Sequence, residues 1–124
     1  MQNGEIVDTQ ISSSSSIDEA HAASRGRLHL NATSGKAGAW SAGTNDNSQW
    51  LQVDLRNNNI RVSGVATQGR NGRYAQWVTK YKLQYSNNGV NFQYYKEPGH
   101  TALKVCTKSF QLPMPLFMFI VHFF

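Results

Sequence analysis

The stretch Trp50-Leu51-Gln52-Val53-Asp54-Leu55 alternates strictly between apolar and polar side chains after its opening tryptophan. In an extended strand successive side chains point to opposite faces, so the three aliphatic residues share one face and Gln52 and Asp54 share the other. A second apolar run, Ile60 to Gln68, follows the polar residues 56–59. The sequence therefore predicts two strands in the middle of the core.

The later part of the chain repeats this alternation. Residues from Trp77 to Ser86 predict a strand, Asn87-Asn88-Gly89 signals a hairpin turn, and Val90 to Lys96 predicts the return strand. The apolar residues expected in phase on that return strand are Val90, Phe92 and Tyr94. With no amphipathic helix of useful length, short strands separated by turns predict an all-β antiparallel sandwich or barrel.

The N-terminal third of the chain is less regular. Ile6 to Ile11 predicts a short edge strand, and the serine run Ser12 to Ser16 is compatible with a linker or with a strand of small residues. Asp18 to Ala23 has helical propensity but is too short for a stable helix alone. Residues 34–48 are rich in Gly, Ser, Ala and Asn, which predicts a surface loop anchored by Trp40.

Composition and charge narrow the class of protein. With 124 residues, 40% hydrophobic and 15% charged, the chain predicts one globular domain. Its net charge is +5, and the segment between Asp54 and Glu97 holds no acid. The bases in that segment are Arg56, Arg61, Arg70, Arg73, Lys80, Lys82 and Lys96. They favour an anionic partner, although ordinary solvent-facing bases are the alternative, and no nucleic-acid motif accompanies them.

The residues that could carry catalysis or hold a metal are scattered. The chain has four histidines and the single cysteine Cys106, without metal-ligand spacing, and Asp54 has no second carboxylate near it in sequence. We therefore expect no enzyme activity, no cofactor and no metal site. The N-terminus lacks the apolar run of a secretory signal, and Leu112 to Phe124 is shorter than the about 20 residues that cross a bilayer.

Three segments together resemble a known family. Gln49 to Leu55, Val62 to Arg70 (Val-Ser-Gly-Val-Ala-Thr-Gln-Gly-Arg) and Tyr81 to Gly89 (Tyr-Lys-Leu-Gln-Tyr-Ser-Asn-Asn-Gly) follow in the order and spacing of the discoidin domain. That domain is also called the coagulation factor V/VIII type C domain. Glu5 to Ile11, followed by the serine run, is similar to the family's opening segment, and the resemblance covers residues 3–105.

The resemblance implies an eight-stranded jelly-roll barrel with loops projecting from one end. Family members are non-catalytic, mostly extracellular recognition modules that bind anionic phospholipid, carbohydrate, collagen or other proteins. The leading hypothesis is therefore an extracellular or cell-surface adhesion module that binds a glycan or a protein. The alternatives are peripheral binding to phosphatidylserine membranes and an accessory carbohydrate-binding domain of a larger secreted enzyme.

The chain also departs from the family. The cysteine pair that usually joins the termini is absent, and residues 106–124 form an apolar tail without family pattern. That the tail fills the gap left by the missing strands is the alternative, but Pro113 and Pro115 argue against a central strand there. We therefore expect a truncated domain that lacks its last strands, which would leave core face and strand edges open and favour aggregation.

By position, the family's binding loops fall at Ile17 to Ser24, Gly35 to Ala42 and Gly69 to Gln76. The residues expected to contact a ligand there are Asp18, Glu19, His21, Arg70, Asn71, Arg73 and Tyr74. An arginine fork can clamp a carboxylate or sulfate, and a tyrosine ring can stack on a sugar.

The loops predict glycan or protein binding more strongly than deep insertion into lipid. In the first and third loops the only apolar residues expected to insert into lipid are Ile17 and Tyr74, and Asp18 and Glu19 of the first loop would be repelled by an anionic surface. A structural alternative is that Arg70 pairs with a loop acid such as Asp18. The tryptophans Trp40, Trp50 and Trp77 are expected to be core or loop-anchoring residues.

One further motif is the sequon Asn31-Ala32-Thr33, which would be glycosylated only if the chain is secreted.

Overall fold

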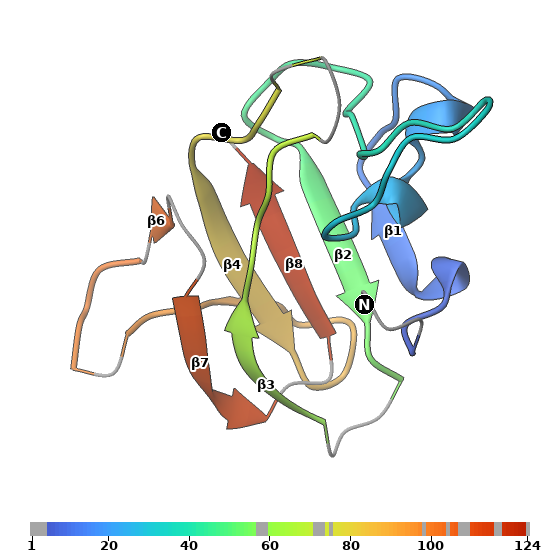
Figure 1. The fold of residues 1–124 in the computed structure, drawn as a ribbon. Coiled ribbons are helices and arrows are strands. Elements are labelled where there is room, and N and C mark those ends of the chain that lie inside the picture. The colour runs from blue at the N-terminus through green and yellow to red at the C-terminus, as the bar shows by residue number, and fades with distance from the viewer. Residues whose placement is uncertain are drawn as a thin grey trace.

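The computed structural model describes residues 5–56, 60–70, 74, 76–97, 99–103, 105–106, 110–115 and 118–123. Within these ranges the chain forms strands and three short 3-10 helices, and every strand pair is antiparallel (Figure 1). The strands are β1 (Ile11–Ser13), β2 (Trp50–Asp54), β3 (Arg61–Val65), β4 (Tyr81–Ser86), β5 (Gln93–Tyr94), β6 (Val105–Cys106), β7 (Phe110–Pro115) and β8 (Met118–Phe123). The all-β prediction is confirmed.

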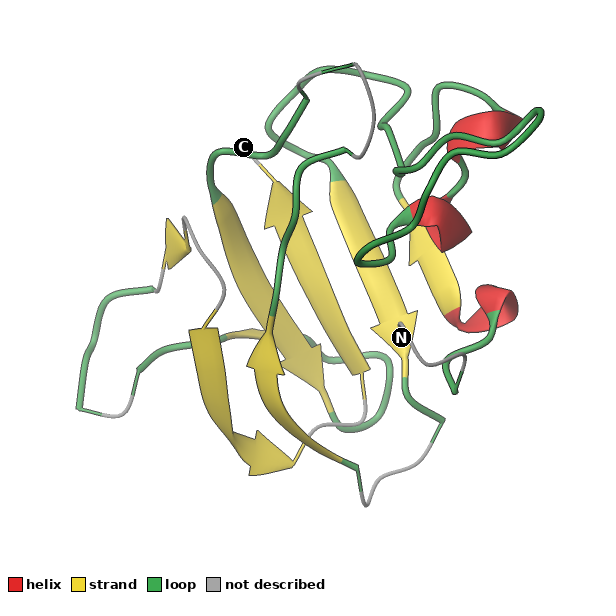
Figure 2. Ribbon diagram, viewed as in Figure 1, coloured by secondary structure: helices red, strands yellow, loops and turns green. Residues whose placement is uncertain are grey.

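The strands make two sheets. The larger has the order β1-β2-β8-β4-β5, with β6 paired to the other end of β4, and the smaller consists of β3 and β7. Figure 2 shows the smaller sheet in front of one end of the larger sheet. The core lies between them, and it combines the apolar face of β2 with Val65 of β3, Tyr81 and Leu83 of β4, and Tyr95.

The alternation predicted for the opening stretch is confirmed. Leu51, Val53 and Leu55 are buried, whereas Gln52 and Asp54 are only half-buried. The polar face also has a structural use, because Asp54 accepts hydrogen bonds: its Oδ1 from the backbone N–H of Arg56 at 2.8 Å and its backbone oxygen from the Gln10 side chain at 2.6 Å. A face that buries three aliphatic side chains holds β2 in one register.

The apolar tail does not leave the large sheet open, and this part of the prediction is wrong. Strand β8 lies in the centre of that sheet, paired along its length with β2 on one side and with β4 on the other. Its register places Val121 opposite both Leu51 and Leu83. The tail therefore supplies strands that the truncated family pattern was expected to lack.

The positions of the two prolines explain how the tail can supply a central strand. Both lie in β7, whose strand partner among the described residues is β3, and the β3–β7 register shifts between Val62 and Gly64. Proline has no backbone N–H and is tolerated at edges and bulges, whereas a central strand needs donors on both sides. The proline-free residues 118–123 are the ones that occupy the centre.

Several strands are shorter than predicted. β3 ends at Val65 instead of reaching Gln68, and β4 begins at Tyr81 because Trp77 to Lys80 continue the alternation without a strand partner among the described residues. On the return strand the expected phase is wrong. Tyr95 is buried at 3% exposure and its N–H donates to Leu83 O at 2.8 Å, whereas Val90 is 79% exposed.

The N-terminal third turns mainly into short helical turns. Asp8–Gln10 form the 3-10 helix η1 where part of an edge strand was expected, and β1 then contains two of the five serines. The predicted helical propensity after Ile17 appears as the two short helices η2 (Glu19–His21) and η3 (Ala23–Arg25). None of the helices in the described ranges has the length and apolar character needed to cross a membrane.

Truncating a core side chain of β4 tests this packing. Leu83 is 1% exposed, so Leu83→Ala should lower the free energy of unfolding by about 2–5 kcal/mol, as expected when a buried leucine leaves a cavity. Val90→Ala is the matched control, because a highly exposed side chain should change stability by less than about 0.5 kcal/mol. Urea denaturation of both variants measures the difference, and equal stabilities would contradict the assigned core.

Candidate ligand-binding site at the loop end

The three expected binding loops gather at one end of the molecule. Residues 17–24 and 35–42 lie at the end of the large sheet where β2 begins, and the segment between β3 and β4 reaches the same end (Figure 1). The first two loops contact each other through backbone hydrogen bonds: Ile17 N–H donates to Ser41 O at 3.0 Å, and Ala37 N–H donates to Ala20 O at 2.9 Å.

Gln49 joins these loops to the core. Its buried side-chain oxygen accepts hydrogen bonds from the hydroxyls of Ser14 at 2.7 Å and Ser15 at 2.6 Å. Its side-chain nitrogen donates to Thr44 Oγ1 at 2.8 Å and to Asp46 Oδ1 at 2.9 Å. The amide thus uses both of its lone pairs and both of its protons, which is the full capacity of a glutamine side chain.

The serine run has a structural role at this end, so it is not a free linker. Ser15 accepts through its backbone oxygen from Trp40 Nε1 at 2.9 Å, and its hydroxyl oxygen accepts from Gly43 N–H at 2.9 Å. The expected anchoring role of Trp40 is confirmed by the first contact. Small side chains suit this position because a methyl group at Gly43 would lie 3.0 Å from the backbone oxygen of Ser16.

The first loop is closed on itself by an acid and a histidine. Asp18 is the N-cap of η2: its Oδ1 accepts from His21 N–H at 2.9 Å and lies 2.6 Å from His21 Nδ1. The side-chain hydrogen bond with His21 lowers the pKa of the Asp18 carboxyl below its ordinary value. Glu19 is exposed beside them. Two of the predicted ligand contacts, Asp18 and His21, are therefore already paired with each other.

The third loop has its own internal contacts. The Arg70 N–H donates to Gln76 O at 2.8 Å, and Arg70 Nη1 donates to Gln76 Oε1 at 2.8 Å. The guanidinium carbon lies 4.9 Å from the centre of the Tyr74 ring, a cation–π distance. The alternative of an Arg70–Asp18 ion pair is not observed between these two described residues. Asn71 and Arg73 lie outside the described residues.

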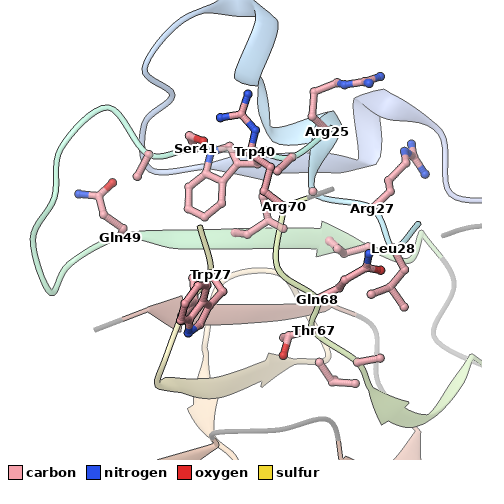
Figure 3. A pocket seen from close by; sticks show the side chains of 18 of the residues that line it. Arg25, Arg27, Leu28, Trp40, Ser41, Gln49, Thr67, Gln68, Arg70 and Trp77 are labelled. Atoms are coloured by element: carbon pink, nitrogen blue, oxygen red, sulfur yellow. The ribbon is translucent and has the colours of Figure 1, made fainter. Parts of the chain in front are cut away.

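A hollow of about 1380 Å³ opens beside these loops. It reaches between the sheets, where Leu51, Val53 and Val62 line it, and its other lining residues include residues 38–42, 44–47, 64–70 and 76–79. Figure 3 shows Trp40, Trp77 and Gln49 toward one side of it. Of the described residues predicted as contacts, Arg70 lines this hollow, whereas Asp18, Glu19, His21 and Tyr74 do not.

The arginines at the hollow differ in how they are held. Arg25 donates through Nε to Ala37 O at 2.6 Å and through Nη2 to Asn31 O at 3.0 Å. Arg27 forms an ion pair with Asp8 at 2.6 Å. Figure 3 shows the guanidinium groups of both pointing away from the hollow. They brace the loops, and the Arg70 guanidinium extends toward the same side of Figure 3, where it hydrogen-bonds to Gln76.

Trp77 is the residue that the sequence interpretation placed wrongly. It is 66% exposed and lines the hollow, so it is neither a core residue nor a buried anchor. The error arose because its alternation with Thr79 and Tyr81 continues that of β4, although the strand starts only at Tyr81. Gly69 packs against this segment, since a methyl group there would lie 3.3 Å from Trp77 Cβ and 3.2 Å from Gln76 O, but this contact is visible only in the tertiary structure.

With the fold and the loop end described, the comparisons with known proteins identify the family. Residues 10–115 match the F5/8 type C domain. The chain belongs to the F5/8 type C domain family. This is the discoidin family that the strand motifs predicted, and its members are binding modules that are generally non-catalytic.

Relatives in sequence include lactadherin of Bos taurus, 43% identical over 72 residues that cover 57% of this chain and 17% of lactadherin. The "EGF-like repeat and discoidin I-like domain-containing protein 3" of Homo sapiens is 37% identical over 117 residues, 89% of this chain and 24% of that protein. The chain thus spans a quarter or less of the length of these relatives. Relatives of this kind are secreted or cell-surface proteins.

The fold is also found in a solved structure. Discoidin II of Dictyostelium discoideum superposes with a TM-score of 0.74 at 21% identity, over 90% of this chain and 47% of that one. At this identity the similarity supports the jelly-roll fold, and it agrees with the two antiparallel sheets described above.

The Gln49 network predicts a stability cost. Gln49→Ala removes a buried amide that makes four hydrogen bonds to Ser14, Ser15, Thr44 and Asp46, so we expect the free energy of unfolding to fall by about 1–3 kcal/mol. The amide of Gly43 should exchange faster with solvent, because its acceptor Ser15 is no longer held. Gln93→Ala, at an exposed position of β5, is the control and should leave both the stability and the exchange of the Gly43 amide unchanged. If Gln49→Ala also left the exchange of the Gly43 amide unchanged, the hydrogen bonds of Gln49 would not hold this loop.

The Asp18–His21 contact predicts a pH effect. Because the folded-state pKa of Asp18 is depressed, its cap contributes stability above the unfolded pKa and loses it as the pH falls through the folded pKa, on the acid side of 3.8. An NMR titration should place the Asp18 pKa below 3.8 in the wild type and closer to that value in His21→Ala. A pKa that is unaffected by His21→Ala would rule out the histidine as the cause.

Proposed function

We propose that this domain is an extracellular glycan-recognition module that binds its ligand at the mouth of the hollow beside Trp77. The observation that carries the proposal is the exposure of Trp77 next to Arg70 in the wall of that hollow. Trp77 and its neighbour Val78 are both exposed, and apolar side chains that gather at a surface rimmed by polar residues are typical of binding sites. The family assignment, which includes carbohydrate-binding modules, supports this reading.

The chemistry of these side chains suits a sugar that carries a negative charge. The indole face of Trp77 offers an apolar plane on which the carbon–hydrogen face of a sugar ring can pack. Among the described residues, the Arg70 guanidinium hydrogen-bonds only to Gln76, through Nη1. Its remaining donors can take a carboxylate or sulfate in a fork geometry.

The loops around the hollow are fixed by hydrogen bonds, which favours a preorganised binding site. The Arg70 backbone is fixed by its hydrogen bond to Gln76, and the guanidinium group lies over the Tyr74 ring. On the side of the hollow that Trp77 shares with Trp40 and Gln49, Trp40 is held by Ser15 and the Gln49 amide makes its full set of hydrogen bonds. A site whose side chains are already positioned loses less conformational entropy when it binds, so modest contacts suffice. Of the residues first predicted from sequence, we retain Arg70 and Tyr74 as ligand-site residues and add Trp77.

Binding to an anionic phospholipid surface is the second candidate, and a specific observation favours it. Ile17, Tyr74, Trp77 and Val78 are all exposed, with Ile17 at 62%, which is more apolar surface at the loop end than the sequence indicated. Aromatic and aliphatic side chains next to a basic residue can enter the membrane interface. Asp18 and Glu19 in the first loop oppose this, because an anionic surface repels them.

A paired binding experiment separates the two candidates. The whole chain is tested on an array of neutral, sialylated and sulfated glycans, and on phosphatidylserine vesicles with phosphatidylcholine vesicles as reference. We expect binding to acidic glycans that weakens about tenfold or more in Trp77→Ala, a loss of about 1.4 kcal/mol. Arg70→Ala should weaken binding to acidic glycans by a similar factor. Arg70→Lys should retain only part of the affinity, because lysine lacks the two parallel donors of a guanidinium group.

Two further variants make the result specific. Val90→Ala alters a side chain at the far end of β4 and should leave glycan binding unchanged. Ile17→Ser removes an apolar side chain that does not line the hollow, so it should weaken vesicle binding without changing glycan binding. Salt-sensitive binding to phosphatidylserine vesicles that Ile17→Ser reduces, with no glycan bound, would replace the first proposal by the second.

A further inference from the structure

We propose that Asn31 is an N-glycosylation site in the folded domain, an inference that rests on the proposed extracellular function. Asn31-Ala32-Thr33 has the acceptor pattern Asn-x-Thr with a residue other than proline in the middle. Such triplets occur by chance in many chains, so the structure around the triplet has to decide whether this one can carry a sugar.

The side chains of all three residues are exposed. Among the described residues, the structure gives the Asn31 side chain no hydrogen bond, and the residue contacts the rest of the domain through its backbone oxygen, which accepts from Arg25 Nη2 at 3.0 Å. A sugar on Nδ2 would therefore displace no described contact. A sequon is modified on the nascent chain, so the condition that matters is that the folded state can hold the modified side chain, and this position meets it.

The local backbone also presents the triplet well. Thr33 and Lys36 exchange two backbone hydrogen bonds, at 2.9 and 3.1 Å, which form a tight turn with Gly35 at φ +73°. Threonine is used in this turn through its backbone, so its hydroxyl is not needed for the fold. The turn projects at the upper right of Figure 1, in teal, on the β1 side of the molecule.

This position is compatible with ligand binding. Residues 76–80 lead into β4, on the other side of β2 from β1, so a glycan on Asn31 would extend away from Trp77. Neither Asn31 nor Thr33 lines the hollow. We therefore expect the modification to shield the β1 side of the loop end and to leave the proposed binding site open.

The reaction requires an oligosaccharide carried on a polyisoprenyl diphosphate. Asn31 Nδ2 forms a bond to the anomeric carbon of the first sugar, and the bond from that carbon to the diphosphate oxygen breaks. The lipid diphosphate leaves with the electron pair, and the amide nitrogen gives up one proton. The amide remains neutral, so the net charge of the domain itself does not change.

The test expresses the whole chain behind a cleavable secretion signal in mammalian cells and analyses every signal-cleaved molecule, secreted or retained. We expect a glycan that peptide N-glycosidase removes, converting the side chain at position 31 from an amide to a carboxylate that peptide mass spectrometry detects. Asn31→Gln and Thr33→Ala should abolish the modification, whereas Thr33→Ser should retain part of it. Signal-cleaved wild-type chain without sugar at position 31 would overturn the proposal.

Two controls separate this inference from the proposed function. Gln93→Thr creates a second acceptor triplet at the exposed Asn91, and its modification shows that the chain reached the transferase. Glycan-array binding by unmodified bacterial protein tests the function without reference to Asn31. Equal ligand binding by the wild type and by Asn31→Gln is expected, and a loss of binding caused by the attached sugar would contradict the placement away from Trp77.

Discussion

The burial of the aliphatic face of β2 is the constraint on which the rest of the structure depends. Leu51 and Val53 lie on a strand that pairs with β1 on one side and β8 on the other, so the position of β2 determines where both neighbours run. Shifting its register by one residue would turn Gln52 and Asp54 into the core. Because such a shift would bury a carboxylate, the register of the whole large sheet is strongly specified.

Gln49 transmits this constraint from the sheet to the loops. It is adjacent to the first residue of β2, so its position follows that of the strand, and its amide binds the serine run and the 44–46 segment together. A buried amide with every hydrogen bond made is favourable, whereas a displaced loop would leave it unsatisfied at a cost of about 1–3 kcal/mol. The loops that frame the hollow are therefore coupled to the core and do not vary independently.

The arginines at the loop end have two roles: some stabilise the loops, and one lies at the proposed ligand site. Arg25 and Arg27 are used inside the loop end, where they bind backbone oxygens and Asp8. Arg70 is held at the wall of the hollow beside an exposed tryptophan. The same net charge of +5 is therefore compatible with a site that selects an acidic group by geometry, and not only with general attraction to anionic surfaces.

The amino-acid sequence alone determined the all-β class and the strands around Leu51 and Leu83, and the order and spacing of the strand motifs determined the family. These follow from local alternation and turn chemistry, which depend on residues close in the chain. The pairing of Asp18 with His21 and the exposure of Trp77 were not predictable in this way. Nor was the central position of β8, whose partners lie far away in the sequence. Only the tertiary structure decides such features, because exposure and strand order are set by long-range contacts.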